Sequence, residues 1–91
     1  MTRWNRFYQE QLEDKQLKAL VEQELEVLRI GAKIAALRKE EGLTQTKLAA
    51  RAGMPSSKIS AIENNPQNLE IATLVRIAHA ARRKLKVEFT P

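Results

Sequence analysis

A helix expected over residues 55–63 carries short or basic side chains on its outer face. Serine hydroxyls can donate to or accept from most base edges, and an alanine methyl can contact the methyl group of thymine. A helix whose outer face carries such short side chains can therefore lie close to the bases in a major groove. The side chains of this face are Ser56, Ser57 and Ala61 toward the bases, and Lys58 and Ser60 toward the flank.

A second helix, expected over residues 45–52, must hold this reading helix in place. Thr44 is a suitable N-cap for it, and Gly53 can adopt the positive φ that ends it and turns the chain. Pro55 suits the first turn of the reading helix, which Asn64-Asn65-Pro66 ends. Two helices joined by a tight turn form a helix-turn-helix.

Apolar residues at helical spacing predict how these two helices pack. The two helices are expected to cross at a steep angle. A small residue is needed where they touch, because the backbones come closest at that point. Ala49 meets that need. The apolar positions are Leu48, Ala49, Ala52, Met54, Ile59 and Ile62.

The excess positive charge lies in the part of the chain that contains the predicted helix-turn-helix. Residues 1–30 hold 5 basic and 6 acidic side chains, a net charge of −1, and residues 31–91 hold 11 basic and 5 acidic side chains, a net charge of +6. This asymmetry favours a polyanionic partner. Gln45 and Lys47, at the start of the first helix, can hold phosphates together with backbone N–H groups.

The composition argues against several classes of protein. A chain of 91 residues forms one small domain, with a terminal appendage at most. It has no cysteine and one histidine, so disulfides are excluded and neither a metal site nor a cofactor is expected. His79 has no nucleophile or acid placed to work with it, so no enzymatic activity is expected. No apolar run approaches the roughly 20 residues of a transmembrane helix, which predicts a cytoplasmic protein.

An aromatic stripe marks the N-terminal segment, residues 1–28. Trp4, Phe7, Tyr8 and Leu12 would share one face of a helix. Such a face either packs on the body of the protein or binds a partner, and both readings stay open.

Further helices are expected on both sides of the helix-turn-helix. Asp14 can cap a helix over residues 15–28, and the apolar register shifts near residues 24–27. The shift allows either two helices or one bent helix that ends at Gly42. After the motif, Asn68 is a suitable N-cap for a helix over residues 69–81.

The last residues change period from helix to strand. Residues 84–90 alternate apolar and polar side chains, and no other strand is evident in the sequence. The simplest partner is the same strand of a second copy, in an antiparallel two-fold pair. The alternatives are a strand folded back on its own domain and a disordered tail. The apolar face consists of Leu85, Val87 and Phe89.

Arg38 and Glu63 could lock two helices in orientation. Arg38 lies near the end of the helix before the motif, and Glu63 lies at the end of the reading helix. If their salt bridge is buried, removal of one partner would cost about 3–5 kcal/mol. The alternative is two unrelated surface charges.

These observations predict an all-α fold of about five helices with a central helix-turn-helix and one short C-terminal β-strand that pairs across a homodimer. Residues 1–28 are the helical segment that is a candidate for partner binding. Residues 29–82 form the DNA-binding domain, and residues 83–91 contain the dimerisation strand.

Residues 34–80 resemble the Cro and phage-repressor type of helix-turn-helix, the Xre family. The resemblance rests on Ile34, Arg38, Gly42-Leu43-Thr44-Gln45, Leu48-Ala49, Gly53, Ile59-Ser60, Ile62-Glu63-Asn64, Leu74 and Ile77-Ala78. It implies a lambda-repressor-like fold that binds double-stranded operator DNA. It also implies phosphate contacts for Gln45 and Asn64, an internal ion pair of Arg38 with Glu63, and base-facing positions for Pro55, Ser56, Ser57 and Ala61. In that family, long amide side chains often stand at the positions of Pro55, Ser56 and Ser57. The shorter side chains here make fewer direct base contacts, so phosphate contacts and dimer spacing are expected to carry much of the specificity.

The whole chain resembles the HigA-type antitoxins more narrowly. The resemblance rests on architecture: a Trp-containing N-terminal helix, an acidic helix, the domain above and a closing strand with the pattern Leu-x-Val-x-Phe-x-Pro. It implies a bacterial homodimer that neutralises a RelE-like, mRNA-cleaving toxin by direct binding and represses its own operon, where it would associate with the nucleoid. At Ala81-Arg82-Arg83 the relatives usually have a glycine that closes the last helix.

The acidic, aromatic segment of residues 4–26 suits a basic, RNA-binding toxin. Two other functions compete with this one. The first is a standalone Xre-type repressor with no toxin partner, and the second is a protein-interaction adaptor that uses the fold without DNA.

Overall fold

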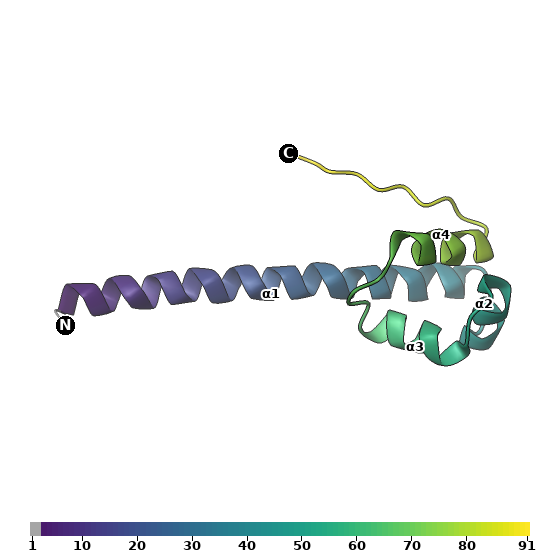
Figure 1. Cartoon of the computed structure of the whole chain (residues 1–91), viewed down its shortest axis with the longest axis horizontal. Coiled ribbons are helices and arrows are strands. Elements are labelled where there is room, and N and C mark those ends of the chain that lie inside the picture. Colours follow the sequence, from purple (N-terminus) through teal and green to yellow (C-terminus); the bar gives the residue numbers. More distant parts are fainter. Residues whose placement is uncertain (1–2) are drawn as a thin grey trace.

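The computed structural model describes the backbone of residues 3–91 and the side chains of residues 10, 11 and 13–91. This part of the chain contains four helices: α1 (Arg3–Glu40), α2 (Gln45–Ala52), α3 (Ser56–Asn64) and α4 (Ile71–Ala80). α3 contacts both α1 and α2, and α2 contacts α4, around the C-terminal third of α1 (Figure 1). The all-α prediction is therefore confirmed, whereas the predicted count of about five helices is wrong.

The difference in helix count arises because α1 is one continuous helix of 38 residues. It contains no proline, and the residues at the shift in apolar register, Glu24 to Val27, are mostly strong helix formers, so nothing breaks the backbone there. Asp14 lies inside α1 rather than at a cap. The principal extents of 61 × 29 × 21 Å reflect this long helix. No helix in the described residues is both long and apolar enough to cross a membrane.

Residues 3–28 of α1 form an arm that projects from the other helices (Figure 1). The helix ends where predicted, because Gly42 adopts a φ of 69°. The Gly42 N–H donates to the carbonyl of Lys39 at 2.9 Å, and the Leu43 N–H donates to the carbonyl of Arg38 at 3.0 Å. This is a Schellman-type closure, which satisfies carbonyls that the helix end would otherwise leave free.

The helix-turn-helix follows the predicted local signals closely. Thr44 caps α2, and Gly53 ends it with a φ of 68°. The N–H of Met54 donates to the carbonyl of Ala49 at 3.0 Å across this turn. Pro55 is the N-cap of α3 rather than its first residue, one position from the expectation.

α4 begins later than predicted. Glu70 stands at its N-cap position, and Asn68 instead adopts a φ of 55° in the turn before it. Asparagine tolerates the left-handed conformation better than most residues. Asn68 therefore turns the chain rather than caps the helix.

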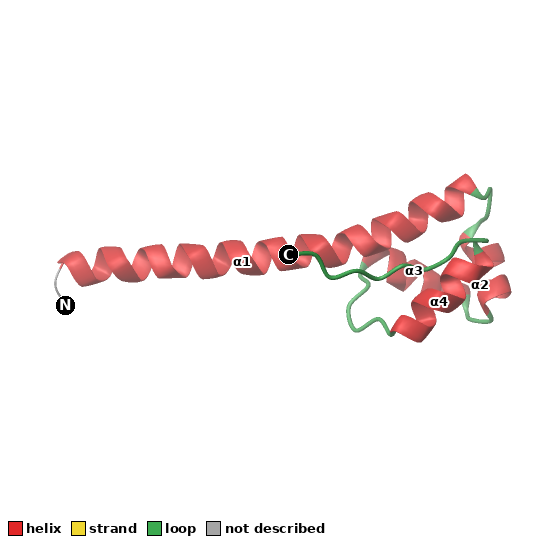
Figure 2. Ribbon diagram, turned by 90° about the horizontal axis from the view of Figure 1, so that it is seen from above, coloured by secondary structure: helices red, strands yellow, loops and turns green. Residues whose placement is uncertain are grey.

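The C-terminal segment forms no strand in the described part of the chain. The prediction of a strand with Leu85, Val87 and Phe89 on its apolar face is therefore wrong for the single chain. Residues 83–91 form an extended loop (green in Figure 2) that leaves the end of α4 and diverges from α1 toward the C-terminus (Figure 1). A strand needs a second extended segment to receive its hydrogen bonds, and residues 3–82 provide only helices and their connections. Pairing with a second copy stays a prediction.

The core is built from small and aliphatic side chains. Leu48, Ile59 and Ile77 are completely or almost completely buried and come from α2, α3 and α4 respectively. Ile34 joins them from α1, and Ala49 is 2% exposed at the α2–α3 crossing, as predicted. The buried cluster consists of Ile34, Leu43, Leu48, Ala49, Ala52, Ile59, Ile62, Ile77, Ala80 and Ala81.

Candidate nucleic-acid interface

α3 presents one face to the core and the opposite face to solvent. Ile59 and Ile62 are 0% and 6% exposed. Ser57, Ala61 and Asn64 are exposed and, at about 100° of rotation per residue, lie on the side away from these isoleucines. The helix is therefore anchored on one side and open on the other. Three further residues predicted to contact DNA, Pro55, Ser56 and Lys58, are also exposed. Ser60 is half-buried.

The N-terminal turn of α3 is open to an acceptor. Pro55 makes no side-chain cap bond. The N–H groups of Ser56 and Ser57 belong to the first turn, where helical geometry supplies no acceptor. Such N–H groups can donate to phosphate or carbonyl oxygens. This is compatible with the prediction that Ser56 and Ser57 face the DNA groove.

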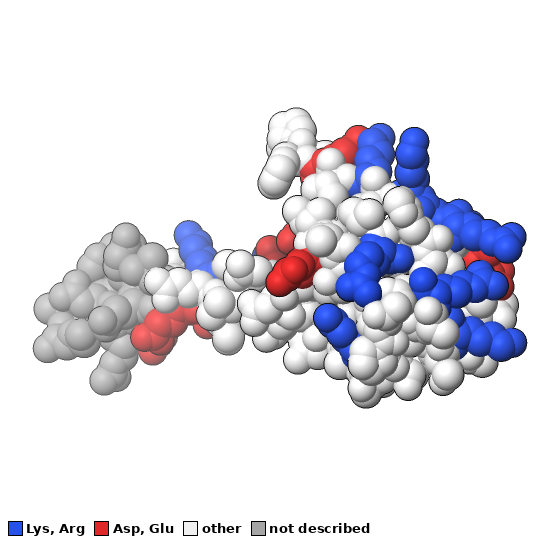
Figure 3. Space-filling view, turned by 45° about the vertical axis from the view of Figure 1, so that its right-hand side comes forward, with Lys and Arg blue, Asp and Glu red and all other residues white. Residues whose placement is uncertain are grey.

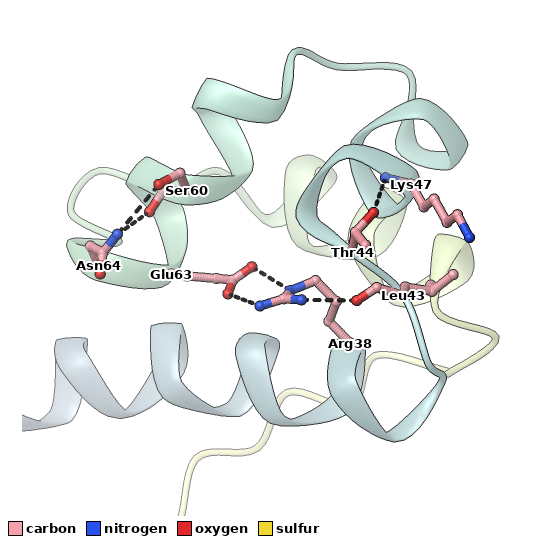
Figure 4. Close-up of polar contacts among 7 residues, drawn as sticks. All are labelled: Arg38, Leu43, Thr44, Lys47, Ser60, Glu63 and Asn64. Carbon is pink, nitrogen blue, oxygen red and sulfur yellow. Dashed lines mark hydrogen bonds and ion pairs between the residues drawn. The ribbon is translucent and has the colours of Figure 1, made fainter.

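The N-terminal turn of α2 offers a second contact. The backbone N–H of Lys47 donates to the Thr44 hydroxyl at 3.1 Å, which fixes the start of the helix (Figure 4). The Lys47 side chain is exposed, and Gln45, the first residue of α2, is half-buried. A lysine at a helix N-terminus can neutralise a phosphate without base preference.

Asn64 closes the last turn of α3. Its Nδ2 donates to the carbonyl of Ser60 at 2.8 Å and lies 3.5 Å from the Ser60 hydroxyl (Figure 4). This contact orients the amide at the edge of the exposed face. The phosphate contact expected for Asn64 would have to use the part of the amide that Ser60 leaves free.

An ion pair holds α3 against α1. Nε of Arg38 donates to Oε2 of Glu63 at 2.9 Å, and Nη2 donates to Oε1 at 3.0 Å, so the pair is bidentate (Figure 4). Nη1 of Arg38 also donates to the carbonyl of Leu43 at 2.8 Å. The two side chains are only 12% and 6% exposed. The geometry couples the direction of α3 to α1 and to the entry of α2.

Most basic side chains in view in Figure 3 lie on the helical domain, and few lie on the arm. Figure 3 shows lysine and arginine side chains gathered over the domain with few acidic ones among them, whereas the arm carries mainly acidic side chains. The arrangement in space follows the division of charge along the sequence. A negatively charged ligand is therefore attracted to the domain.

Two sets of predicted residues lie at the chain ends. Trp4, Phe7, Tyr8 and Leu12 lie outside the side chains that the structure describes, so the aromatic stripe stays a prediction. The residues predicted to pair between two copies are Leu85, which is half-buried, and Val87 and Phe89, which are 57% and 100% exposed.

Sequence reasoning missed the role of Arg76. Its Nε and Nη2 donate to the carbonyl of Ala52 at 3.1 and 2.7 Å, and Nη2 donates to the carbonyl of Gly53 at 2.8 Å. Arg76 thus ties α4 to the turn of the helix-turn-helix. Its partners lie 23 and 24 positions away, and no local pattern links them.

Comparisons with known proteins agree with this geometry. Residues 34–86 match the family model HTH_3, described as helix-turn-helix. An uncharacterized HTH-type transcriptional regulator, y4dJ, of Sinorhizobium fredii is 37% identical over 51 residues. Those residues are 56% of this chain and 66% of the relative, just under two thirds of its length.

Two solved structures share the arrangement of the helices. The restriction-modification controller protein C.Esp1396I superposes with a TM-score of 0.62 at 31% identity, over 64% of this chain and 75% of that chain. A chain from the structure of a HipA-HipB-O2-O3 complex superposes with a TM-score of 0.62 at 26% identity, over 70% of this chain and 90% of that chain. Because the family match covers more than half of the sequence and includes the α2–α3 unit, the chain belongs to the helix-turn-helix family.

Proposed function

We propose that this helix-turn-helix regulator is a sequence-specific transcriptional repressor and the antitoxin of a type II toxin–antitoxin pair. The observation that carries the repressor function is the exposed outer face of α3, which the bidentate ion pair of Arg38 and Glu63 fixes to α1. A rigid helix with short side chains can enter a major groove without a cost for ordering it.

A homodimer would place two such helices on one operator. Recognition helices of a two-fold dimer lie about 34–36 Å apart when they enter successive major grooves, so a palindromic site is expected. The extended Leu85–Phe89 segment would pair with its counterpart and set this distance. Repression would follow because the bound dimer occupies promoter DNA.

The DNA contact is tested by titrating a duplex from the region upstream of the protein's own reading frame at several salt concentrations. We expect preference over a scrambled duplex and a linear fall of log K with log salt concentration. Lys47→Ala should weaken binding to both duplexes and reduce the magnitude of the salt slope by about 1. Ser57→Ala should lower the preference and leave the slope almost unchanged.

Lys18→Ala is the matched control, because Lys18 is exposed on the arm and carries the same charge as Lys47. It should leave both duplex affinities within about twofold, since a charge more than a Debye length of about 10 Å away is screened. Equal affinity of the unmodified protein for the two duplexes would contradict the repressor function and favour the adaptor.

The antitoxin function rests on the arm. Leu17, Leu20 and Val21 are 61%, 60% and 49% exposed. A helix with so much exposed apolar surface gains stability when a partner covers it. The acidic residues of the arm favour a basic partner, as an RNA-cleaving enzyme would be. The similarity to a chain from a HipA-HipB complex also supports a protein partner.

The antitoxin function is tested by co-expression with the adjacent small, basic reading frame. Full-length protein should relieve growth arrest and co-purify with the product of that frame. Deletion of residues 1–13, or the double change Leu17→Ala and Val21→Ala, should abolish the rescue while promoter binding stays within about threefold. Equal loss of both activities would show that the arm is structural. If the full-length protein does not relieve growth arrest, the antitoxin function is wrong and the standalone repressor is favoured.

A further inference from the structure

A shallow hollow of about 650 Å³ lies between the end of α2 and the C-terminal half of α4. Cationic groups dominate its lining, and none of its lining residues is acidic. The predicted groove residues lie elsewhere, on α3 and at the first turn of α2. The hollow is lined by Arg51, Ala52, Arg76, His79, Ala80 and Arg82.

One guanidinium in this hollow is already fixed in place. Arg76 uses Nε and Nη2 to bind the carbonyls of Ala52 and Gly53. Its Nη1 makes no hydrogen bond within the described part of the chain and remains available to an external acceptor. A pre-organised guanidinium binds an anion with a smaller loss of side-chain entropy than a free one.

The positive charge of the hollow is not balanced by neighbouring residues. Among the described residues, neither Arg51 nor Arg82 forms an ion pair, whereas the adjacent Arg83 lies 3.5 Å from a carboxylate oxygen of Glu40 and 2.6 Å from one of Glu41. The C-terminal ends of α2 and α4 contribute about half a negative charge each. They offset about one of the three guanidinium charges.

The closure of α4 brings Arg82 to the same place, since the Arg82 N–H donates to the carbonyl of His79 at 3.0 Å and the Arg83 N–H donates to the carbonyl of Ala78 at 2.7 Å. Arg82 adopts a φ of 57°, in the left-handed region. This conformation costs a residue with a side chain roughly 1–2 kcal/mol, and glycine would occupy it freely. Glycine is the usual residue at such a helix-closing position, and here an arginine places a cation beside the hollow.

We propose that this hollow binds the phosphate groups of a polyanion. The planar guanidinium groups of Arg51 and Arg82 can bind phosphate oxygens bidentately, and Arg76 can add a hydrogen bond from Nη1, so the three together can hold adjacent phosphates. The phosphates have two possible sources. Arg51 follows Lys47 by one turn on α2, so a DNA backbone held at Lys47 could continue to the hollow. A free nucleotide or polyphosphate could also enter it.

The site is tested by titrating pyrophosphate into the full chain while backbone amide shifts are followed by NMR. We expect saturable shifts at Arg51, Arg76, His79 and Arg82. Arg82→Gly should weaken pyrophosphate binding at least fivefold and raise the melting temperature, because it removes both a cation and the strained backbone. Opposite changes in binding and stability separate loss of the site from loss of the fold.

Arg83→Gln is the matched control, since it removes the same charge at the next position but outside the hollow. It should change pyrophosphate affinity less than twofold. Equal loss in Arg82→Gly and Arg83→Gln, or non-saturating shifts spread over all lysines and arginines, would overturn the proposal.

The source of the phosphates is distinguished with the promoter duplex. If the DNA backbone occupies the hollow, Arg82→Gly reduces the magnitude of the salt slope by about 1. If a free ligand occupies it, Arg82→Gly leaves the affinity for the duplex unchanged and lowers only the affinity for pyrophosphate. Both outcomes support a phosphate site. The pyrophosphate result does not depend on promoter preference, so failure of the repressor function and failure of this proposal remain separate.

Discussion

Glu63→Gln should lower the free energy of unfolding by about 3–5 kcal/mol. The change leaves the Arg38 guanidinium charged and 12% exposed, with the carbonyl of Leu43 and a neutral amide as its remaining acceptors. Small domains have a total stability of about 5–15 kcal/mol, so much of it would be lost. The loss should be visible as a lower urea midpoint at an unchanged m value.

The control is Glu40→Gln, which removes a carboxylate of the same size and charge from the surface. Glu40 is 66% exposed and lies 3.5 Å from Arg83, so its removal should cost less than about 1 kcal/mol. A third variant, Arg38→Met with Glu63→Leu, should recover most of the lost stability, because it buries no unpaired charge. Equal effects of Glu63→Gln and Glu40→Gln would show that the internal pair contributes little.

Gly31→Ala should destabilise the domain by about 1–3 kcal/mol or more, although alanine usually stabilises a helix interior by about 1 kcal/mol relative to glycine. A Cβ at Gly31 would overlap the carbonyl oxygen of Glu63 and lie 2.9 Å from the carbonyl oxygen of Ile62. Both are backbone atoms, so α1 and α3 would have to separate. Arg38 lies two turns after Gly31 on α1, so the separation would also stretch its bond to Glu63.

Thermal unfolding of Gly31→Ala and Gly42→Ala separates the steric effect from backbone preference. Gly42 adopts a φ of 69° with no atom within 4 Å of an added Cβ, so alanine there should cost only about 1–2 kcal/mol from backbone conformation. Ala32→Gly, at an exposed neighbour of Gly31, should cost up to about 1 kcal/mol from propensity. A Gly31→Ala variant as stable as the unmodified protein would contradict the close approach of α1 and α3.

The sequence alone determined the helix-turn-helix and its boundaries to within a residue or two. Thr44, Gly53 and Gly42 act on the backbone of their own neighbours, through a cap bond or a positive φ. Such signals are complete within five or six residues. The apolar spacing on α2 and α3 then allowed one mutual packing, which placed Ile59 and Ile62 inside and the serines outside.

Tertiary structure alone decided the features that join distant segments. The close approach at Gly31, the contact of Arg76 with the end of α2 and the cationic hollow all depend on residues far apart in the chain. For Arg38 and Glu63 the sequence indicated a pair, but only packing made it bidentate and nearly buried. Local propensity acts over a few residues, whereas desolvation and steric contact depend on whichever segments the fold brings together.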